Sequence, residues 1–101
     1  MQEVKIIMTW DIVPGRDQEY FEFVVREFAP GIKRLGIQPT QAWFTSFGNA
    51  PQIMMEGIAE NYDTVQQIMG SDDWQGMHDR LLEFVSNYSQ KIVRLLPRFQ
   101  F

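Results

Sequence analysis

The sequence contains one histidine, which is the first candidate for chemistry because a tryptophan lies one helical turn before it. His78 follows Trp74 by four residues, so the two side chains would lie on the same face of a predicted helix. An imidazole that titrates near neutral pH can act as a general base or bind an oxygen of a ligand. A histidine at the edge of a helix, at the surface or at a dimer seam, is the alternative interpretation. His78 is therefore the candidate catalytic residue, and Trp74 is a candidate ligand-binding residue.

Polar residues on the predicted strands form a second candidate site. Thr9 and Asp11 alternate with apolar residues in the first strand, so they would face away from the helices, and Glu56 and Arg94 on neighbouring strands could join them. A carboxylate in a partly dry cavity has a raised pKa unless a cation such as Arg94 pairs with it. An ion pair across a dimer interface is the other explanation. A shift of one residue in the strand register would move these side chains to the opposite face of the sheet.

Composition and charge exclude several classes of function. The chain has no cysteine, which removes disulfides, thiolate catalysis and cysteine-ligated metals, and a single histidine is too few for a zinc site. We therefore expect neither a metal nor a cofactor. The net charge is −4, with 9 basic and 13 acidic residues and no run of Lys or Arg, which argues against nucleic acid and anionic membranes as partners.

Hydrophobic patterning favours a water-exposed domain over a membrane protein. No window approaches about 18 consecutive apolar residues. The sequence starts with acidic Glu3 and Asp11 around a short apolar run instead of a basic leader, so we expect a cytoplasmic protein. With 101 residues, no repeats and no linker, residues 1–101 are predicted to form a single domain.

Alternation and helical spacing predict six main elements. Residues 3–12 alternate as a strand, and a helix capped by Asp17 follows and ends at Gly36, with a kink or loosened turn near Ala29 because Pro30 interrupts it. Residues 40–47 and 52–60 form a hairpin around a Gly/Pro turn.

The second half of the chain adds two helical segments and a last strand. Asn61 or Asp63 opens a short helix that Gly70 interrupts, and Ser71 caps a second helix that runs to about Tyr88. Residues 90–96 form the last strand. Strand, helix, strand, strand, helix, strand is the ferredoxin-like βαββαβ order of the α+β class, a four-stranded antiparallel sheet with helices on one face.

The uncovered face of that sheet predicts a homodimer. Trp43 and Phe47 would lie on one side of the second strand and Phe44 on the other, so either register leaves apolar groups in water. Pairing two such sheets would cover them. Phe99 and Phe101 in the tail lack partners within the chain, and packing on the other subunit would hide them.

With these elements placed, the chain resembles the dimeric α/β-barrel superfamily, the ferredoxin-like group that includes antibiotic-biosynthesis monooxygenases, haem-degrading monooxygenases and NIPSNAP-like proteins. The likeness covers nearly the whole chain. It rests on the element order, on the turn at residues 13–15, on the Ala29-Pro30-Gly31 step before Gly36, and on residues 71–74 at the start of the last helix. The resemblance implies a homodimer whose two sheets close into a barrel with a small cavity.

The resemblance also bears on the site. The cofactor-free monooxygenases of this group depend on a strand Asn, a Trp and a helix His in a hydrophobic pocket. Trp74 and His78 are candidate counterparts, as are Trp10 and Trp43, whereas the first strand has Thr9 and Asp11 where the amide would stand. Haem-degrading members use the histidine as an iron ligand, but this chain has no basic cluster for the propionates.

Three functional hypotheses follow. The leading one is a homodimeric barrel that binds a small apolar or aromatic molecule, because the three Trp, eight Phe and six Met residues could line a pocket, although such residues more often form the core. The second is a cofactor-independent monooxygenase-like enzyme on an aromatic substrate, with His78 as base or proton shuttle and Trp74 as a stacking wall. The third is a structural or regulatory interaction module with a packed barrel.

Overall fold

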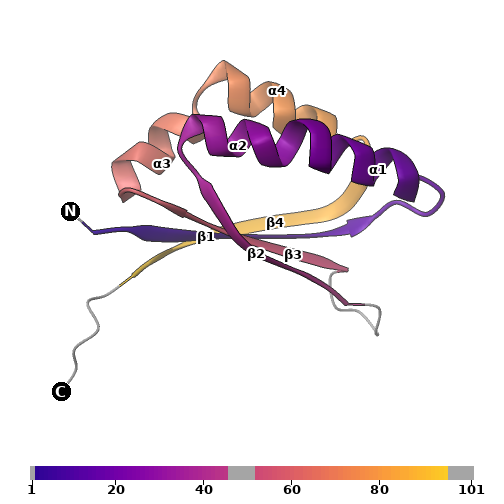
Figure 1. Cartoon of the computed structure of the whole chain (residues 1–101), viewed down its shortest axis with the longest axis horizontal. Helices are drawn as coiled ribbons and strands as arrows, with labels where there is room; N and C mark the ends of the chain where they lie inside the picture. Colours follow the sequence, from indigo (N-terminus) through magenta and orange to yellow (C-terminus); the bar gives the residue numbers. More distant parts are fainter. Residues whose placement is uncertain (1, 46–51, 96–101) are drawn as a thin grey trace.

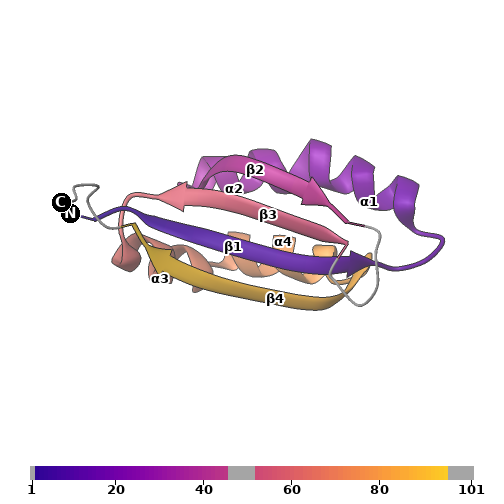
Figure 2. The ribbon, with the colours of Figure 1, turned by 90° about the horizontal axis from the view of Figure 1, so that it is seen from below.

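Four antiparallel strands form one sheet in the order β2-β3-β1-β4 in the computed structural model, which describes residues 2–45 and 52–95. The helices all lie on one face of the sheet (Figure 1), and Figure 2 shows the opposite face uncovered. The predicted ferredoxin-like α+β fold is confirmed. The elements are β1 Val4–Ile12, α1 Asp17–Phe23, the π-helical η1 Val24–Phe28, α2 Ala29–Leu35, β2 Gln38–Phe44, β3 Ile53–Ala59, α3 Tyr62–Met69, α4 Asp72–Leu81 and β4 Val85–Arg94.

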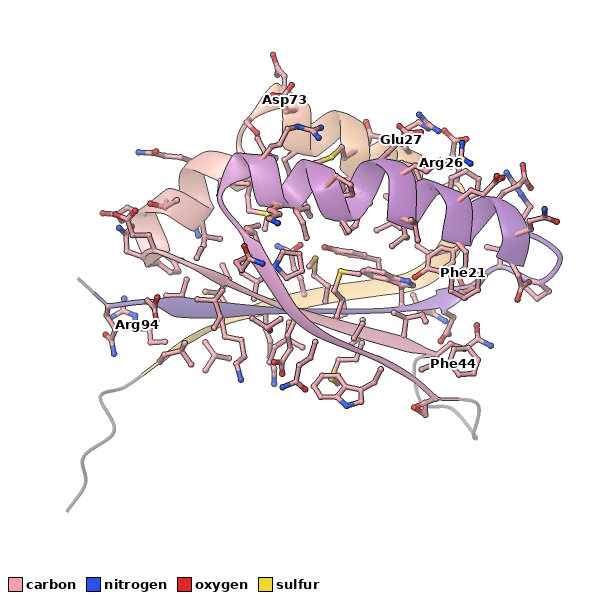
Figure 3. All side chains as sticks on the ribbon, in the orientation of Figure 1. Phe21, Arg26, Glu27, Phe44, Asp73 and Arg94 are labelled. Carbon is pink, nitrogen blue, oxygen red and sulfur yellow. The ribbon has the colours of Figure 1, made fainter. Side chains whose placement is uncertain are left out.

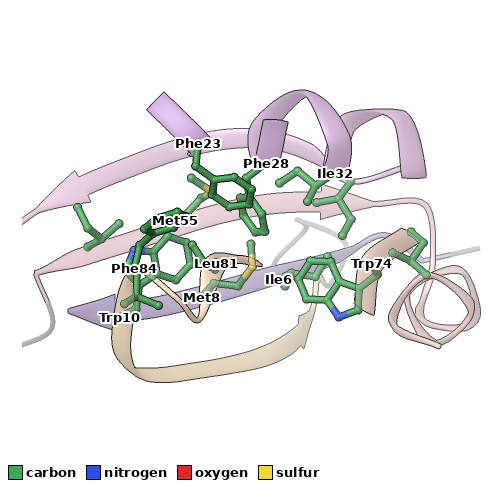
Figure 4. Close-up of a cluster of buried hydrophobic side chains, with 14 of the residues drawn as sticks. Ile6, Met8, Trp10, Phe23, Phe28, Ile32, Met55, Trp74, Leu81 and Phe84 are labelled. Carbon is green, nitrogen blue, oxygen red and sulfur yellow. The ribbon is translucent and has the colours of Figure 1, made fainter. Parts of the chain in front are cut away.

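The central strand β1 separates two chemical environments. Burial alternates residue by residue along it, with the apolar set turned toward the helices and fully buried, as predicted. The half-buried set, which includes Lys5, Thr9 and Asp11, lies on the uncovered face. The helix-side residues of β1 join the hydrophobic core shown in Figure 4, where Met8 and Trp10 lie with Phe28 of the first long helix, which α1, η1 and α2 form together.

The first long helix contains the loosened turn that Pro30 predicts. The chain makes a π-helical segment, η1, directly before Ala29. Proline lacks an N–H and its ring clashes with the carbonyl four residues earlier, so a wider turn relieves both problems. Gly36 ends the helix in the left-handed conformation at φ 119°, as predicted. The prediction for Asp17 is wrong, because Arg16 occupies the cap position without a capping side chain and Asp17 is the first helical residue.

The caps of the later helices are confirmed. The Oδ1 atom of Asn61 accepts a hydrogen bond from Thr64 N at 2.9 Å, and Ser71 Oγ accepts one from Trp74 N at 3.2 Å. The predicted extension of the last helix to Tyr88 is wrong, because α4 ends at Leu81. Apolar residues continue at helical spacing, but from Val85 onward pairing with β1 satisfies the backbone instead.

Two further boundaries differ from the sequence prediction. The second strand begins at Gln38 instead of residue 40, and the last strand begins at Val85 instead of residue 90. The predicted hairpin turn, Phe47 and the tail with Phe99 and Phe101 lie outside the described residues. Among the helices of the described part, none is long and apolar enough to cross a bilayer.

Candidate functional site

His78 belongs to a ring of aromatic side chains between the sheet and the helices. Its imidazole stacks on Trp74, with ring centroids 5.4 Å apart, and meets Tyr88 edge-on at 4.6 Å. Tyr88 stacks in turn on Trp10 at 5.9 Å, and Phe28 contacts both tryptophans at 6.0 Å. We call Trp10, Phe28, Trp74, His78 and Tyr88 the aromatic cluster.

Helical spacing and an irregular strand place four members of the aromatic cluster. Trp74 and His78 are one turn apart on α4, and Phe28 is the buried residue of η1. Tyr88 arrives through an irregularity in β4, where the register with β1 shifts between Thr9 and Asp11. There β4 carries one extra residue, and Asn87 adopts a left-handed φ of 56°.

The imidazole of His78 has a buried nitrogen without a partner. Nε2 is inaccessible to solvent and makes no hydrogen bond within the described residues. Burial lowers the pKa of His78 below its ordinary 6.5, and the nearby Asp79 carboxylate opposes this change only in part. The imidazole is therefore neutral at neutral pH, so one of its two nitrogens carries a proton and the other can accept one.

Two tyrosines extend the aromatic cluster with polar groups. Trp10 Nε1 donates to the Tyr20 hydroxyl at 2.8 Å, and burial raises the pKa of Tyr20 to about 12. The Tyr88 hydroxyl donates to Gln90 Oε1 at 2.6 Å, and Gln90 Nε2 contacts the sulfur of Met69 at 3.8 Å. Burial also raises the pKa of Tyr88, so both hydroxyls stay protonated at neutral pH.

The second predicted site lies on the other side of the sheet. Thr9 pairs across the strands with Met54 and Ser89 on the uncovered face. Glu56 lies on that face as well, where Lys5 binds it at 3.5 Å, so Lys5 takes the place that the sequence analysis gave to Arg94. The sheet therefore separates these residues from His78 and Trp74, and the predicted residues do not form one site.

Asp11 holds strands together. Its Oδ1 accepts a hydrogen bond from Gln52 N at 3.0 Å, and its Oδ2 accepts one from Asn87 Nδ2 at 2.8 Å. Gln52 Oε1 in turn accepts from the backbone N–H of Ile12 at 2.9 Å. These bonds join β1 to the start of β3 and to the irregular part of β4, so Asp11 is already occupied by structural partners.

Arg94 lies far from both groups. It pairs with the buried Val4, at the end of the sheet where β1 begins, and Figure 3 shows it at the end opposite Phe44. Its guanidinium lies 5.7 Å from the centre of the Tyr62 ring, beside a surface hollow of about 230 Å³. The prediction that Arg94 joins Glu56 is wrong, because its strand position turns it toward the helix side.

Sequence reasoning missed Tyr88 and Gln90. Tyr88 continues the helical spacing of Leu81 and Val85, which placed it on a helix. The signal available was the alternation of residues 88, 90 and 92, which puts their side chains on one face of a strand. Within residues 2–45 and 52–95, no group of three or more His, Asp or Glu side chains is placed to hold a metal ion.

Solved structures share the fold of this chain. No protein-family model matches the chain, and no curated protein sequence matches it. An ethyl tert-butyl ether D (EthD) family protein from Bacillus halodurans shares the fold with a TM-score of 0.70 and 18% identity, covering 95% of this chain and 100% of the other.

Two further solved structures extend that comparison. A NIPSNAP family protein from Agrobacterium tumefaciens has a TM-score of 0.67 and 19% identity, covering 97% of this chain and 89% of that one. A dimeric protein of unknown function and ferredoxin-like fold from Bacteroides fragilis has a TM-score of 0.64 and 16% identity, covering 92% and 96%. The neighbours confirm the resemblance in fold that the sequence indicated, and they supply no specific ligand.

Proposed function

We propose that this chain is a homodimeric ferredoxin-like protein that binds a small aromatic molecule bearing a hydroxyl group, one in each protomer, against His78. The observation that carries the proposal is the buried Nε2 atom of His78, which has no hydrogen-bond partner among residues 2–45 and 52–95. A buried polar atom without a hydrogen bond costs about 1–3 kcal/mol, so such an atom calls for an explanation. A ligand that supplies the missing hydrogen bond is the explanation we adopt.

A hydroxyl group fits this nitrogen in either tautomer. If the proton is on Nδ1, Nε2 accepts a hydrogen bond, and if it is on Nε2, the nitrogen donates one. A hydroxyl both donates and accepts. The flat rings of Trp74 and Tyr88, which flank the imidazole, favour a flat ligand, because aromatic groups pack well by stacking or edge contacts.

The helix side of β4 offers the approach to this nitrogen. The helix-side residues of β1 are fully buried, whereas Tyr88 and Ile92 of β4 are only half-buried and Gln90 is exposed. Within the described residues, β4 is an edge strand, at one end of the order β2-β3-β1-β4. A ligand that approaches over Gln90 therefore meets the least covered side of the aromatic cluster.

The uncovered face of the sheet supports the dimer. Trp43, Met54 and Val93 lie on it with 39–44% of their surface exposed. Between them lie Ile7 and the ion pair of Lys5 with Glu56, so the face is apolar with a central pair of charges. A solved neighbour of this fold is described as dimeric. Face-to-face pairing of two sheets would bury the apolar groups.

A second candidate function uses the same nitrogen as a base. The low pKa of His78 leaves the imidazole neutral and able to take a proton from a phenol. A cofactor-independent oxygenase acting on an electron-rich phenol would use that step. Oxygen consumption that is lost in His78→Ala and retained in Leu81→Met would support this enzyme, and its absence across a phenol panel would leave binding alone.

The proposed function can be tested by calorimetric titration with 2-naphthol and with naphthalene. We expect wild-type protein to prefer 2-naphthol by roughly tenfold, since only 2-naphthol supplies the missing hydrogen bond. His78→Phe keeps a ring between Trp74 and Tyr88 and should abolish the preference. Leu81→Met, a conservative change in the core, should retain it. Equal binding of the two compounds to wild type would contradict the proposal, and no binding of either would favour a structural module.

A further inference from the structure

Gln90 lies on the helix-side face of β4, which also carries Arg94 at its end. It pairs with Met8, which is fully buried on the helix side of the sheet. On β4, Tyr88 precedes it and Ile92 follows it on the same face. Gln90 is itself exposed, so its amide can reach a molecule that approaches over β4.

The amide of Gln90 is held in one orientation. Its Oε1 atom accepts a hydrogen bond of 2.6 Å from the Tyr88 hydroxyl, which turns the NH₂ group toward Met69. There Nε2 lies 3.8 Å from the thioether sulfur, which is a weak acceptor. The amide therefore presents an exposed N–H group that a stronger acceptor could take over.

Tyr88 connects this N–H group to His78. Its ring meets the imidazole at 4.6 Å, and its hydroxyl holds the Gln90 amide. Nε2 of His78, which has no partner in the described part of the chain, and the weakly bonded N–H of Gln90 therefore flank the same tyrosine side chain. Both lie on the helix side of β4, where the approach to the aromatic cluster is least covered.

We infer that Gln90 determines specificity by donating a hydrogen bond to a carbonyl oxygen of the ligand whose hydroxyl group meets His78. The inference rests on the proposed function and deepens it, because it names the ligand class as hydroxyaryl ketones and related hydroxycarbonyl compounds. Met69 gives up its contact with Gln90 when such a ligand binds. Tyr88 is a positioning residue, because it orients the Gln90 amide.

The test compares phenols that differ only in the carbonyl group. The ortho, meta and para isomers of hydroxyacetophenone are each titrated beside the matching ethylphenol, in which CH₂ replaces C=O, and binding is followed by ligand-observed NMR. We expect at least one isomer of the ketone to bind wild type roughly three- to tenfold more tightly than its ethylphenol, the range that one hydrogen bond produces. The preferred isomer reports the spacing between the two polar groups.

Two variants separate the hydrogen bond from its surroundings. Gln90→Glu retains an oxygen that accepts from Tyr88 but loses the N–H group, so it should abolish the ketone preference. Gln18→Glu makes the same amide-to-carboxylate change at an exposed position of α1, in the helix layer and off the uncovered face, and should retain the preference.

The outcomes distinguish this inference from the proposed function. If 2-naphthol binding depends on His78 and no ketone isomer is preferred, or if the preference survives in Gln90→Glu, the role of Gln90 is wrong and the proposed function stands. If no phenol binds in a manner that depends on His78, both are wrong. A ketone preference that Gln90→Glu removes and Gln18→Glu retains supports the inference.

Discussion

The residues around His78 determine the pKa of its imidazole. The aromatic rings around it cover Nε2, and burial lowers the pKa of the half-buried imidazole below 6.5. The spacing of Trp74 and His78 was sufficient to predict that these two side chains meet, because both lie on one helix. The third ring, from Tyr88, comes from a strand, and its arrival depends on pairing between strands far apart in the sequence.

The lowered pKa predicts how stability depends on pH. The unfolded chain takes up a proton at His78 near pH 6.5, whereas the folded protein does so only at lower pH. Below about pH 7.5 the unfolded state therefore binds more protons at this residue, and the free energy of unfolding falls as the pH drops through 6.5 toward the pKa of the folded state. Urea unfolding of wild type and His78→Phe across this range measures the effect.

Since the chain has a single histidine, no other histidine contributes to the difference between wild type and His78→Phe. The difference in unfolding free energy between wild type and His78→Phe should shift against wild type as the solution is acidified. A difference that does not change with pH would show that folding leaves the pKa of His78 unperturbed.

The variant Asp11→Ala tests whether the hydrogen bonds of Asp11 hold the strands together. In Asp11→Ala, the backbone N–H of Gln52 and the amide of Asn87 lose their acceptor, and we expect a loss of about 1–2 kcal/mol in unfolding free energy. Removal of another carboxylate in Glu3→Ala, at an exposed position, serves as the control. A thermal or denaturant melt of Asp11→Ala that matches wild type would argue against Asp11 joining the strands.

At the scale of the elements, we expect substitution of glycine by alanine to change the unfolding free energy in opposite directions at Gly57 and Gly76. In β3, a Cβ atom on Gly57 would lie 2.5 Å from Ile37 Cγ2 and 3.3 Å from the carbonyl oxygen of Gln38. Ile37 is fully buried and its branched side chain is stiff, so Gly57→Ala should lower the unfolding free energy by about 1–3 kcal/mol.

Gly76 lies in the exposed part of α4 and is the matched control. A Cβ atom there would meet nothing within 4 Å. Alanine favours a helix over glycine by roughly 0.5–1 kcal/mol, so Gly76→Ala should raise the unfolding free energy by about that amount. Denaturant titration of both variants gives the comparison, and a stabilising Gly57→Ala would show that the packing of β2 against β3 is looser than described.

The elements themselves were largely predictable, and the exceptions have physical causes. Alternation in β1, the caps at Asn61 and Ser71, and the stop at Gly36 are local signals, and the structure uses each of them. The boundary between α4 and β4 is not local, since the apolar residues after Leu81 fit either a helix or a strand. Pairing of β4 with β1 decides it, and that pairing also places Tyr88 and Gln90.

At the scale of the whole molecule, the uncovered sheet face predicts the oligomeric state. A charge in a buried interface is costly, so Trp43→Glu should convert a dimer into a monomer with the chain mass of 11.9 kDa. Val25→Glu places the same charge on the first long helix, at a position that is 69% exposed, and should leave the dimer intact. Light scattering after size-exclusion chromatography distinguishes these states, and dissociation of only the Val25 variant would place the interface on the helices.

The proposed function depends most on the Nε2 atom of His78. NMR of protein labelled with ¹⁵N in its one histidine observes that atom directly. We predict that 2-naphthol shifts the Nε2 resonance by several ppm at neutral pH and that naphthalene leaves it in place. An Nε2 resonance that stays unchanged at a saturating concentration of 2-naphthol would contradict the proposed function, because the hydroxyl group would then not reach the imidazole.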